Sequence, residues 1–138
     1  MFKLDVRLQS DTFLIAHLPL SDLLLMNDKQ YPWCILVPRV NDISELHELT
    51  DSQQALFNIE SNVLSRLLMD IYQPTTLNVA ALGNVVRQLH IHHVARFEYD
   101  IAWPKPIWGQ REPLAYNQSE AHDVISTIKH HSFLQDII

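Results

Sequence analysis

Two histidines in a short alternating stretch are the residues of this sequence best suited to chemistry. His90 and His92 stand two residues apart, and Gln88 precedes them at the same spacing. Apolar residues alternate with them, which predicts a β-strand over residues 88–96 with Gln88, His90 and His92 on one face. His93 falls on the opposite face, where we expect a structural role for it. A row of imidazoles is costly to bury without partners, so the pattern indicates a functional site more strongly than simple packing.

The elements that must hold this strand begin with short apolar runs. Runs separated by turn residues predict an antiparallel meander over residues 13–18, 22–26 and 33–38. A further strand is expected over residues 75–81. Residues 4–11 carry weak signals and are expected to form a short strand or an irregular lead-in.

The clearest helix pattern lies over residues 50–72. Thr50 and Gln53 form a capping box, and apolar residues follow at helical spacing. A short helix is expected over residues 43–49 and a final helix from Ser119 onward. Together these elements predict an α+β fold, in which the long helix and the C-terminal helix pack on an antiparallel sheet of about five strands. The length of the chain fits a single domain over all 138 residues, 1–138.

The composition of the chain argues against nucleic acid and membranes as binding partners. The formal net charge of −6 argues against a nucleic-acid surface, because such a surface needs a basic patch. No apolar run is long enough to cross a bilayer, so no membrane partner is expected. The single cysteine, Cys34, excludes an internal disulfide framework and fits a reducing cytoplasm. Its apolar neighbours predict a buried and inert thiol.

The histidine stretch resembles the motif of the histidine-triad (HIT) family of nucleotide hydrolases and transferases. That motif reads His-φ-His-φ-His-φ-φ, where φ is apolar. Here the middle and last histidines match as His90 and His92, and Gln88 stands in the place of the first. The stretch Gly83-Asn84-Val85-Val86 resembles the lead-in to the motif, where the family often has Ser or Thr at the position of Val85.

The resemblance extends over residues 13–108. Asn27 and Asp28 follow an apolar run where the family places a ribose-binding acid, and Asn78 matches an Asn that precedes the triad loop. Residues 35–39, Ile-Leu-Val-Pro-Arg, match a strand that ends in Pro and a basic residue. Trp103-Pro104 resembles the tails of family members. The resemblance therefore implies a HIT-like fold, a nucleotide ligand, and substrate binding by Asn27, Asp28, Asn78 and Asn84.

The resemblance also implies a chemistry. His90 would attack the α-phosphate of a nucleotide, because a neutral imidazole held by a backbone carbonyl offers a free lone pair. Water would then release the mononucleotide from His90. His92, Gln88 and Asn84 are the candidates for contacts to the phosphate. Two departures bear on the rate: Gln88 cannot carry a proton charge, and Val85 has no hydroxyl to donate.

Three functions remain open on the sequence. The first is a hydrolase or nucleotidyl transferase that acts on dinucleoside polyphosphates or nucleoside phosphoramidates. The second is a nucleotide-binding module with weak or no turnover, which the departures at Gln88 and Val85 favour. The third is a zinc protein with His90 and His92 as ligands, but no third ligand stands at a motif spacing, so neither a metal nor a cofactor is expected. The wide apolar stripe from Leu56 to Ile71, and the pairing usual in the family, predict a homodimer.

Overall fold

Five antiparallel strands form one open sheet in the computed structural model, which describes all residues 1–138. The strands lie in the order β1-β2-β3-β5-β4, and each pairs antiparallel with its neighbours. Their bounds are Thr12–His17 (β1), Ser21–Met26 (β2), Trp33–Pro38 (β3), Thr76–Ala81 (β4) and Ile91–Arg96 (β5). The predicted meander and the α+β class are therefore confirmed. The order places β5, which carries His92, between two strands, so its backbone is hydrogen-bonded on both sides.

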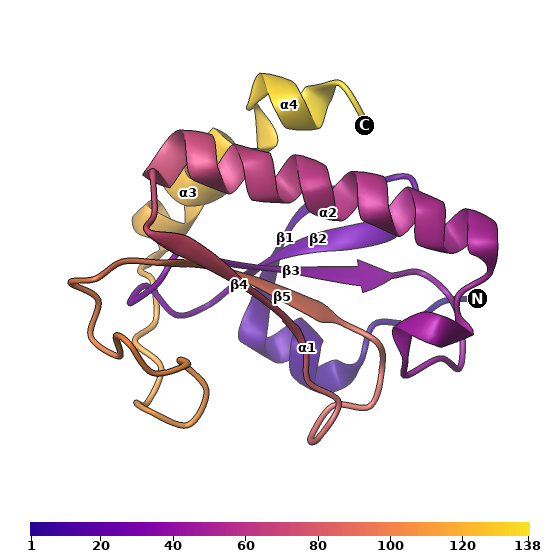
Figure 1. Ribbon diagram of the computed structural model, residues 1–138, viewed down its shortest axis with the longest axis horizontal. Helices are drawn as coiled ribbons and strands as arrows, with labels where there is room; N and C mark the ends of the chain where they lie inside the picture. The colour runs from indigo at the N-terminus through magenta and orange to yellow at the C-terminus, as the bar shows by residue number, and fades with distance from the viewer.

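Helices cover both faces of this sheet. Their bounds are Val6–Asp11 (α1), Asp51–Tyr72 (α2), Gln118–Lys129 (α3) and Ser132–Gln135 (α4), with a 3₁₀ helix at Leu46–Glu48 (η1). Figure 1 shows α2, α3 and α4 on one side of the sheet and α1 on the other, with the orange segment after β5 on the side of α1. None of these helices combines the length and the apolar character that crossing a membrane requires.

The long helix α2 begins where its capping box predicts. The Thr50 side chain accepts a hydrogen bond from the backbone N–H of Gln53, and the Gln53 side chain accepts one from that of Thr50. This reciprocal pair satisfies two backbone donors that a helix start leaves free. Gln73, in the left-handed conformation with φ 49°, ends the helix just before Pro74.

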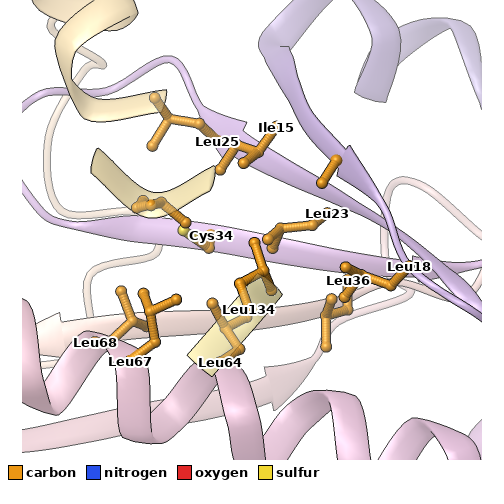
Figure 2. Close-up of a cluster of buried hydrophobic side chains, with 12 residues drawn as sticks. Ile15, Leu18, Leu23, Leu25, Cys34, Leu36, Leu64, Leu67, Leu68 and Leu134 are labelled. Carbon is orange, nitrogen blue, oxygen red and sulfur yellow. The ribbon is translucent and has the colours of Figure 1, made fainter. Parts of the chain in front are cut away.

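The main core lies between the sheet and α2, α3 and α4. Leu64, Leu67 and Leu68 of α2 have no exposed surface and point toward Cys34 and Leu36 of β3 (Figure 2). The predicted inert thiol is confirmed, because Cys34 is fully buried and this burial raises its pKa to about 12.

A second apolar cluster lies on the opposite face, beneath α1. Leu8 packs there with Leu24 of β2 and with Ile35 and Val37 of β3. Neighbouring residues of β2 and β3 thus point alternately into two cores, which explains why both strands are continuous apolar runs.

The prediction for residues 4–11 was wrong, because residues 6–11 form the short helix α1. The Asp5 side chain accepts a hydrogen bond from the N–H of Arg7 at 2.8 Å and caps the helix. Six residues are too few to show a helical period, and so short a helix depends on packing, here of Leu8. The helix expected over residues 43–49 is only the 3₁₀ turn of η1.

Candidate functional site

Strand β5 sends its histidines to opposite faces of the sheet. His92 lies in the strand and His90 lies one residue before it, and both face the side of α1. His93 faces α2, where its Nε2 lies 2.8 Å from the hydroxyl of Ser61. The predicted alternation is therefore confirmed. The strand itself is shorter than predicted, because it begins at Ile91, and Leu89 instead donates its N–H to the carbonyl of Ile43.

The ring of His90 is oriented by the backbone. Its Nδ1 lies 2.7 Å from the carbonyl oxygen of Gln88, which can only accept a hydrogen bond. Nδ1 therefore carries the proton, and Nε2 keeps its lone pair. Only 5% of the residue is exposed, so the surrounding residues hold most of the ring in place. His90 has the geometry of an imidazole nucleophile.

The ring of His92 is held in the opposite tautomer. Its Nδ1 lies 2.9 Å from Nε1 of Trp33, and an indole N–H can only donate. Nδ1 is therefore the acceptor, and Nε2 carries the proton. Burial, together with the neighbouring His90 and His93, lowers the pKa of His92 to about 3. Near neutral pH, His92 thus offers a neutral N–H donor beside the lone pair of His90.

Two indole rings complete the surroundings of His92. The centroids of His90 and His92 lie 5.0 Å apart, and those of Trp33 and Trp108 lie 5.6 and 5.3 Å from that of His92. Trp108 comes from the segment between β5 and α3. Aromatic walls exclude water from the ring of His92 and keep it uncharged.

A buried ion pair at the end of β5 anchors that loop. Arg96 donates from Nε to one oxygen of Asp100 at 2.8 Å and from Nη2 to the other at 3.1 Å. Nη2 also donates to the carbonyl of Lys105 at 2.8 Å. Burial alone would raise the pKa of Asp100, but hydrogen bonds from Arg96 and from backbone amides outweigh it and lower that pKa. The loop therefore starts from a fixed point.

A cavity of about 370 Å³ opens in front of the two histidines. Its polar lining comes from His90, His92, Asn84, Arg7 and Asp11. Its apolar lining consists of Leu8, Met26, Trp33, Leu82, Val85, Val86 and Trp108.

The N-terminal part of this lining was not predicted from the sequence. Arg7 and Asp11 belong to α1, which the sequence did not reveal as a helix. The available signals were Asp5 as a cap and the spacing of Leu4 and Leu8, which is that of one helical turn.

A neighbouring cavity of about 360 Å³ contains two of the predicted substrate-binding residues, of which Asp28 is the predicted ribose acceptor. Asn27 and Asp28 line it, and it shares Asp11, Met26 and Trp33 with the histidine cavity. The two hollows therefore adjoin and form one elongated site. Its histidine end suits a phosphate, and its other end offers a carboxylate and an amide.

Asp28 is 4% exposed and holds part of its surroundings in place. Its Oδ1 accepts from the backbone N–H and the side-chain Nε2 of Gln30, both at 3.0 Å, and from the N–H of Leu114 at 3.3 Å. Every one of these bonds ends on Oδ1, which leaves Oδ2 as the acceptor for a ligand. Asn27 Oδ1 accepts from the N–H of Tyr116 at 2.9 Å, so its oxygen is already engaged.

The structure assigns Gln88 and Asn78 to other partners. The amide of Gln88 accepts from the N–H of Asp5 at 2.8 Å and donates to the carbonyl of Lys3 at 2.9 Å. Its side chain therefore binds the lead-in to α1, and it does not line the cavity of His92. Asn78 Oδ1 accepts from Nη1 of Arg96 at 2.7 Å, away from both cavities. A buried guanidinium needs acceptors, and Asn78 provides one.

The histidines make the stability of the protein depend on pH. Burial lowers the pKa of His92 to about 3 and that of His93 to about 4, whereas an unfolded histidine titrates near 6.5. As the pH falls below 6.5, the unfolded state binds protons that the folded state does not, so the free energy of unfolding decreases. Each group contributes up to about 1.4 kcal/mol per pH unit. Urea unfolding at pH 7, 6 and 5 should show this loss.

A pair of variants isolates the contribution of His92. His92→Gln should reduce the slope of stability against pH between pH 7 and 5, and His93 should account for what remains. His122→Gln is the control, because His122 is exposed on α3 and should leave the slope unchanged. Equal stability of the wild type at pH 7 and pH 5 would contradict the buried, neutral state of both rings.

Comparison with solved structures places the chain among histidine triad proteins. A histidine triad protein from Marinobacter aquaeolei VT8 is 42% identical over 100% of this chain and 99% of its own, with a TM-score of 0.95. One from Bradyrhizobium japonicum is 44% identical over 93% and 96% of the two chains, with a TM-score of 0.90. One from Sinorhizobium meliloti 1021 is 38% identical over 100% and 98%, with a TM-score of 0.91. The comparison with curated proteins found no match.

Comparison of the sequence with family models identifies a family whose motif contains the two histidines. The model of the HIT domain matches residues 7–99, a range that starts in α1 and ends just after β5. It thus includes both rings and most of the residues that line the two cavities. The chain belongs to the HIT domain family.

Proposed function

We propose that this protein is a nucleotide hydrolase or nucleotidyl transferase that forms a covalent nucleotidyl intermediate on His90. Membership of the HIT family supports nucleotide binding and hydrolase or transferase activity in general. The observation that carries the finer proposal is the pair of opposite tautomers. His90, with a lone pair on Nε2, and His92, with an N–H on Nε2, line one cavity, and their ring centroids lie 5.0 Å apart.

The first step forms a bond between His90 Nε2 and the α-phosphorus. The bond from phosphorus to the leaving group breaks, and its electron pair departs with that group. His90 then carries a positive ring, and its Nδ1–H donates to the carbonyl of Gln88 more strongly than before. The Nε2–H of His92 is placed to donate to a phosphate oxygen, where negative charge develops.

The second step releases the mononucleotide. A water oxygen bonds to phosphorus, the electron pair of the N–P bond returns to His90 Nε2, and the water proton leaves to solvent. If the hydroxyl of another molecule takes the place of water, the same site transfers the nucleotidyl group instead. The nucleoside would lie in the adjoining cavity, with its ribose toward Asp28.

A binding module with little turnover is the second candidate. Two features favour it: Val85 lines the cavity without a hydroxyl and is 70% exposed, and the amide of Gln88 is committed to Lys3 and Asp5. A metal site has less support, because the structure contains no group of three or more His, Cys, Asp or Glu residues that could hold an ion.

The nucleophile is tested by replacing His90. His90→Ala should lower turnover of a dinucleoside polyphosphate by at least about a thousandfold, because His92, the other histidine that lines the cavity, has its lone pair engaged by the indole N–H of Trp33. Nucleotide binding should remain, because the cavity walls stay in place. Rapid quenching at alkaline pH, which preserves N–P bonds, should reveal the nucleotidyl adduct by mass in the wild type and not in the variant.

Its control is His47→Ala, since His47 is exposed and does not line the cavity. That variant should retain full turnover and the adduct. Wild-type turnover by His90→Ala would refute the covalent mechanism. Binding without turnover by the wild type would favour the module.

The ribose contact is tested by Asp28→Asn. This change keeps an oxygen for Gln30 and Leu114 but replaces the Oδ2 acceptor by an NH₂ donor. Affinity for a ribonucleotide should fall about tenfold, because one charge-assisted hydrogen bond is lost. Affinity for the matching 2′,3′-dideoxynucleotide, measured by calorimetry, should change little. An equal loss for both ligands would show that Asp28 acts only on the fold.

We also propose that two copies pair through the surface of α2 and strand β4. Leu56 and Ile59 of α2 are 39% and 51% exposed, and Val79 on the edge strand β4 is 50% exposed. An edge strand also leaves backbone donors and acceptors unpaired. A second copy covers such a surface in a closed two-fold arrangement.

Light scattering at micromolar concentration should give the mass of a dimer. Ile59→Asp should shift the mass toward the monomer, because a carboxylate would be buried in the interface. Ile101→Asp is the matched control, since Ile101 is 50% exposed in the loop after β5 and should leave the mass unchanged. A wild-type mass equal to one chain would remove the proposal.

A further inference from the structure

Helix α1 brings one uncommitted cation into the wall of the histidine cavity. Arg7 is the only Lys or Arg among the residues that line this cavity. Within the protein, the hydrogen bonds of Arg7 involve only its backbone: the N–H donates to Asp5 Oδ1 at 2.8 Å, and the carbonyl accepts from the hydroxyl of Ser10 at 3.1 Å. Its guanidinium is therefore free to bind a ligand. In a chain with a net charge of −6, such a cation beside two histidines points to an anion.

The helix that carries Arg7 is fixed at both ends. At its start, the amide of Gln88 binds Lys3 and Asp5, and Asp5 is the cap of the helix. At its end, the carbonyl of Asp11 accepts from the N–H of Asn27 at 3.0 Å. Between them Leu8, 4% exposed, packs into the cluster beneath α1. Arg7 therefore approaches the cavity from an anchored wall.

Gln88 links the histidine motif to the helix that carries Arg7. It stands in the place of the first histidine of the motif and has no charge to offer a phosphate. Its side chain instead anchors the helix that carries Arg7. Within the histidine cavity the positive charge thus comes from α1, whereas Arg87 lines the smaller cavity on the other side of His90.

Two charged side chains of α1, Arg7 and Asp11, line different parts of the elongated site. Arg7 lines only the histidine cavity, whereas Asp11, one turn later on the same helix face, lines both cavities. A nucleotide with its ribose at Asp28 and its α-phosphorus at His90 would extend its further phosphates into the histidine cavity, where Arg7 is the one Lys or Arg of the lining.

The neutral form of His92 favours leaving groups that need no proton from the protein. Burial holds its pKa at about 3, so its Nε2–H donates a hydrogen bond and does not transfer a proton. An amine needs a proton in order to leave. A phosphate departs as an anion, which needs only donors and positive charge.

Resting on the proposed transfer to His90, we propose that Arg7 binds the phosphate groups beyond the α-phosphorus and makes the site specific for an anionic leaving group. When the P–O bond breaks, the electron pair stays on the leaving oxygen, and the guanidinium of Arg7 binds that phosphate. Arg suits this role because its planar donors match phosphate oxygens in pairs. The substrates are then nucleotides joined through a polyphosphate.

Two substrates that differ only in the leaving group test this. Diadenosine triphosphate yields AMP and ADP, and adenosine 5′-phosphoramidate yields AMP and ammonia. Arg7→Gln should lower kcat/KM for the first by at least about tenfold and for the second by less than about twofold. Arg7→Lys should restore part of the loss, because it restores the charge. Arg66→Gln is the control, since Arg66 is an exposed arginine on α2, on the other side of the sheet, and should alter neither value.

A binding measurement decides the inference independently of turnover. Calorimetry should show that the wild type binds ADP at least about tenfold more tightly than AMP, and that Arg7→Gln removes this preference. If the wild type cleaves neither substrate, the proposed function fails, yet the preference for ADP still reports on Arg7. Equal losses on both substrates, equal affinities of the wild type for ADP and AMP, or no binding of either would overturn the role of Arg7.

Discussion

The site depends on keeping two adjacent imidazoles neutral and in opposite tautomers. Two charged rings with centroids 5.0 Å apart would repel each other, and burial penalises a charge on His92. The fold meets this constraint by giving one ring a hydrogen-bond acceptor and the other ring a hydrogen-bond donor, each held in a fixed position. A carbonyl that can only accept holds the proton on Nδ1 of His90, and an indole N–H that can only donate keeps it off Nδ1 of His92. The lone pair and the N–H that face the cavity follow from those two bonds.

Much of the remaining structure keeps those partners in place. Trp33 is fixed because β3 lies inside the sheet, paired with β2 and β5. The carbonyl of Gln88 is fixed because its side chain is bonded to the chain before α1. Trp108 closes the far side of His92 and comes from a loop whose start is held by the ion pair of Arg96 and Asp100. A buried pair of this kind is costly to break, because either partner alone would be an uncompensated charge.

One face of the sheet forms the main core, and the other face forms the candidate site. The face under α2 contains the main core, and there His93 meets Ser61 and serves packing. The face under α1 has two small apolar clusters and no single large core, which leaves room for two adjoining cavities. Strand alternation connects the two faces: His92, which lines the site, and His93, which lies against the helix, are consecutive residues.

The sequence by itself determined the strands, the long capped helix and the facing of His90 and His92, because these depend on local periodicity and capping. It also indicated the family through the spacing of those histidines. The six-residue helix α1 carries no readable period and is stable only through Leu8, Asp5 and the amide of Gln88. Arg7 and Asp11 therefore joined the site only in the folded chain, and Trp33 joined it because the pairing of β3 with β5 brings its indole to His92. The partners of Gln88 and Asn78 were likewise decided only by the tertiary structure, because a side-chain amide binds whichever donor or acceptor folding brings to it. Gln88 binds the residues just before α1, and Asn78 binds the guanidinium of Arg96.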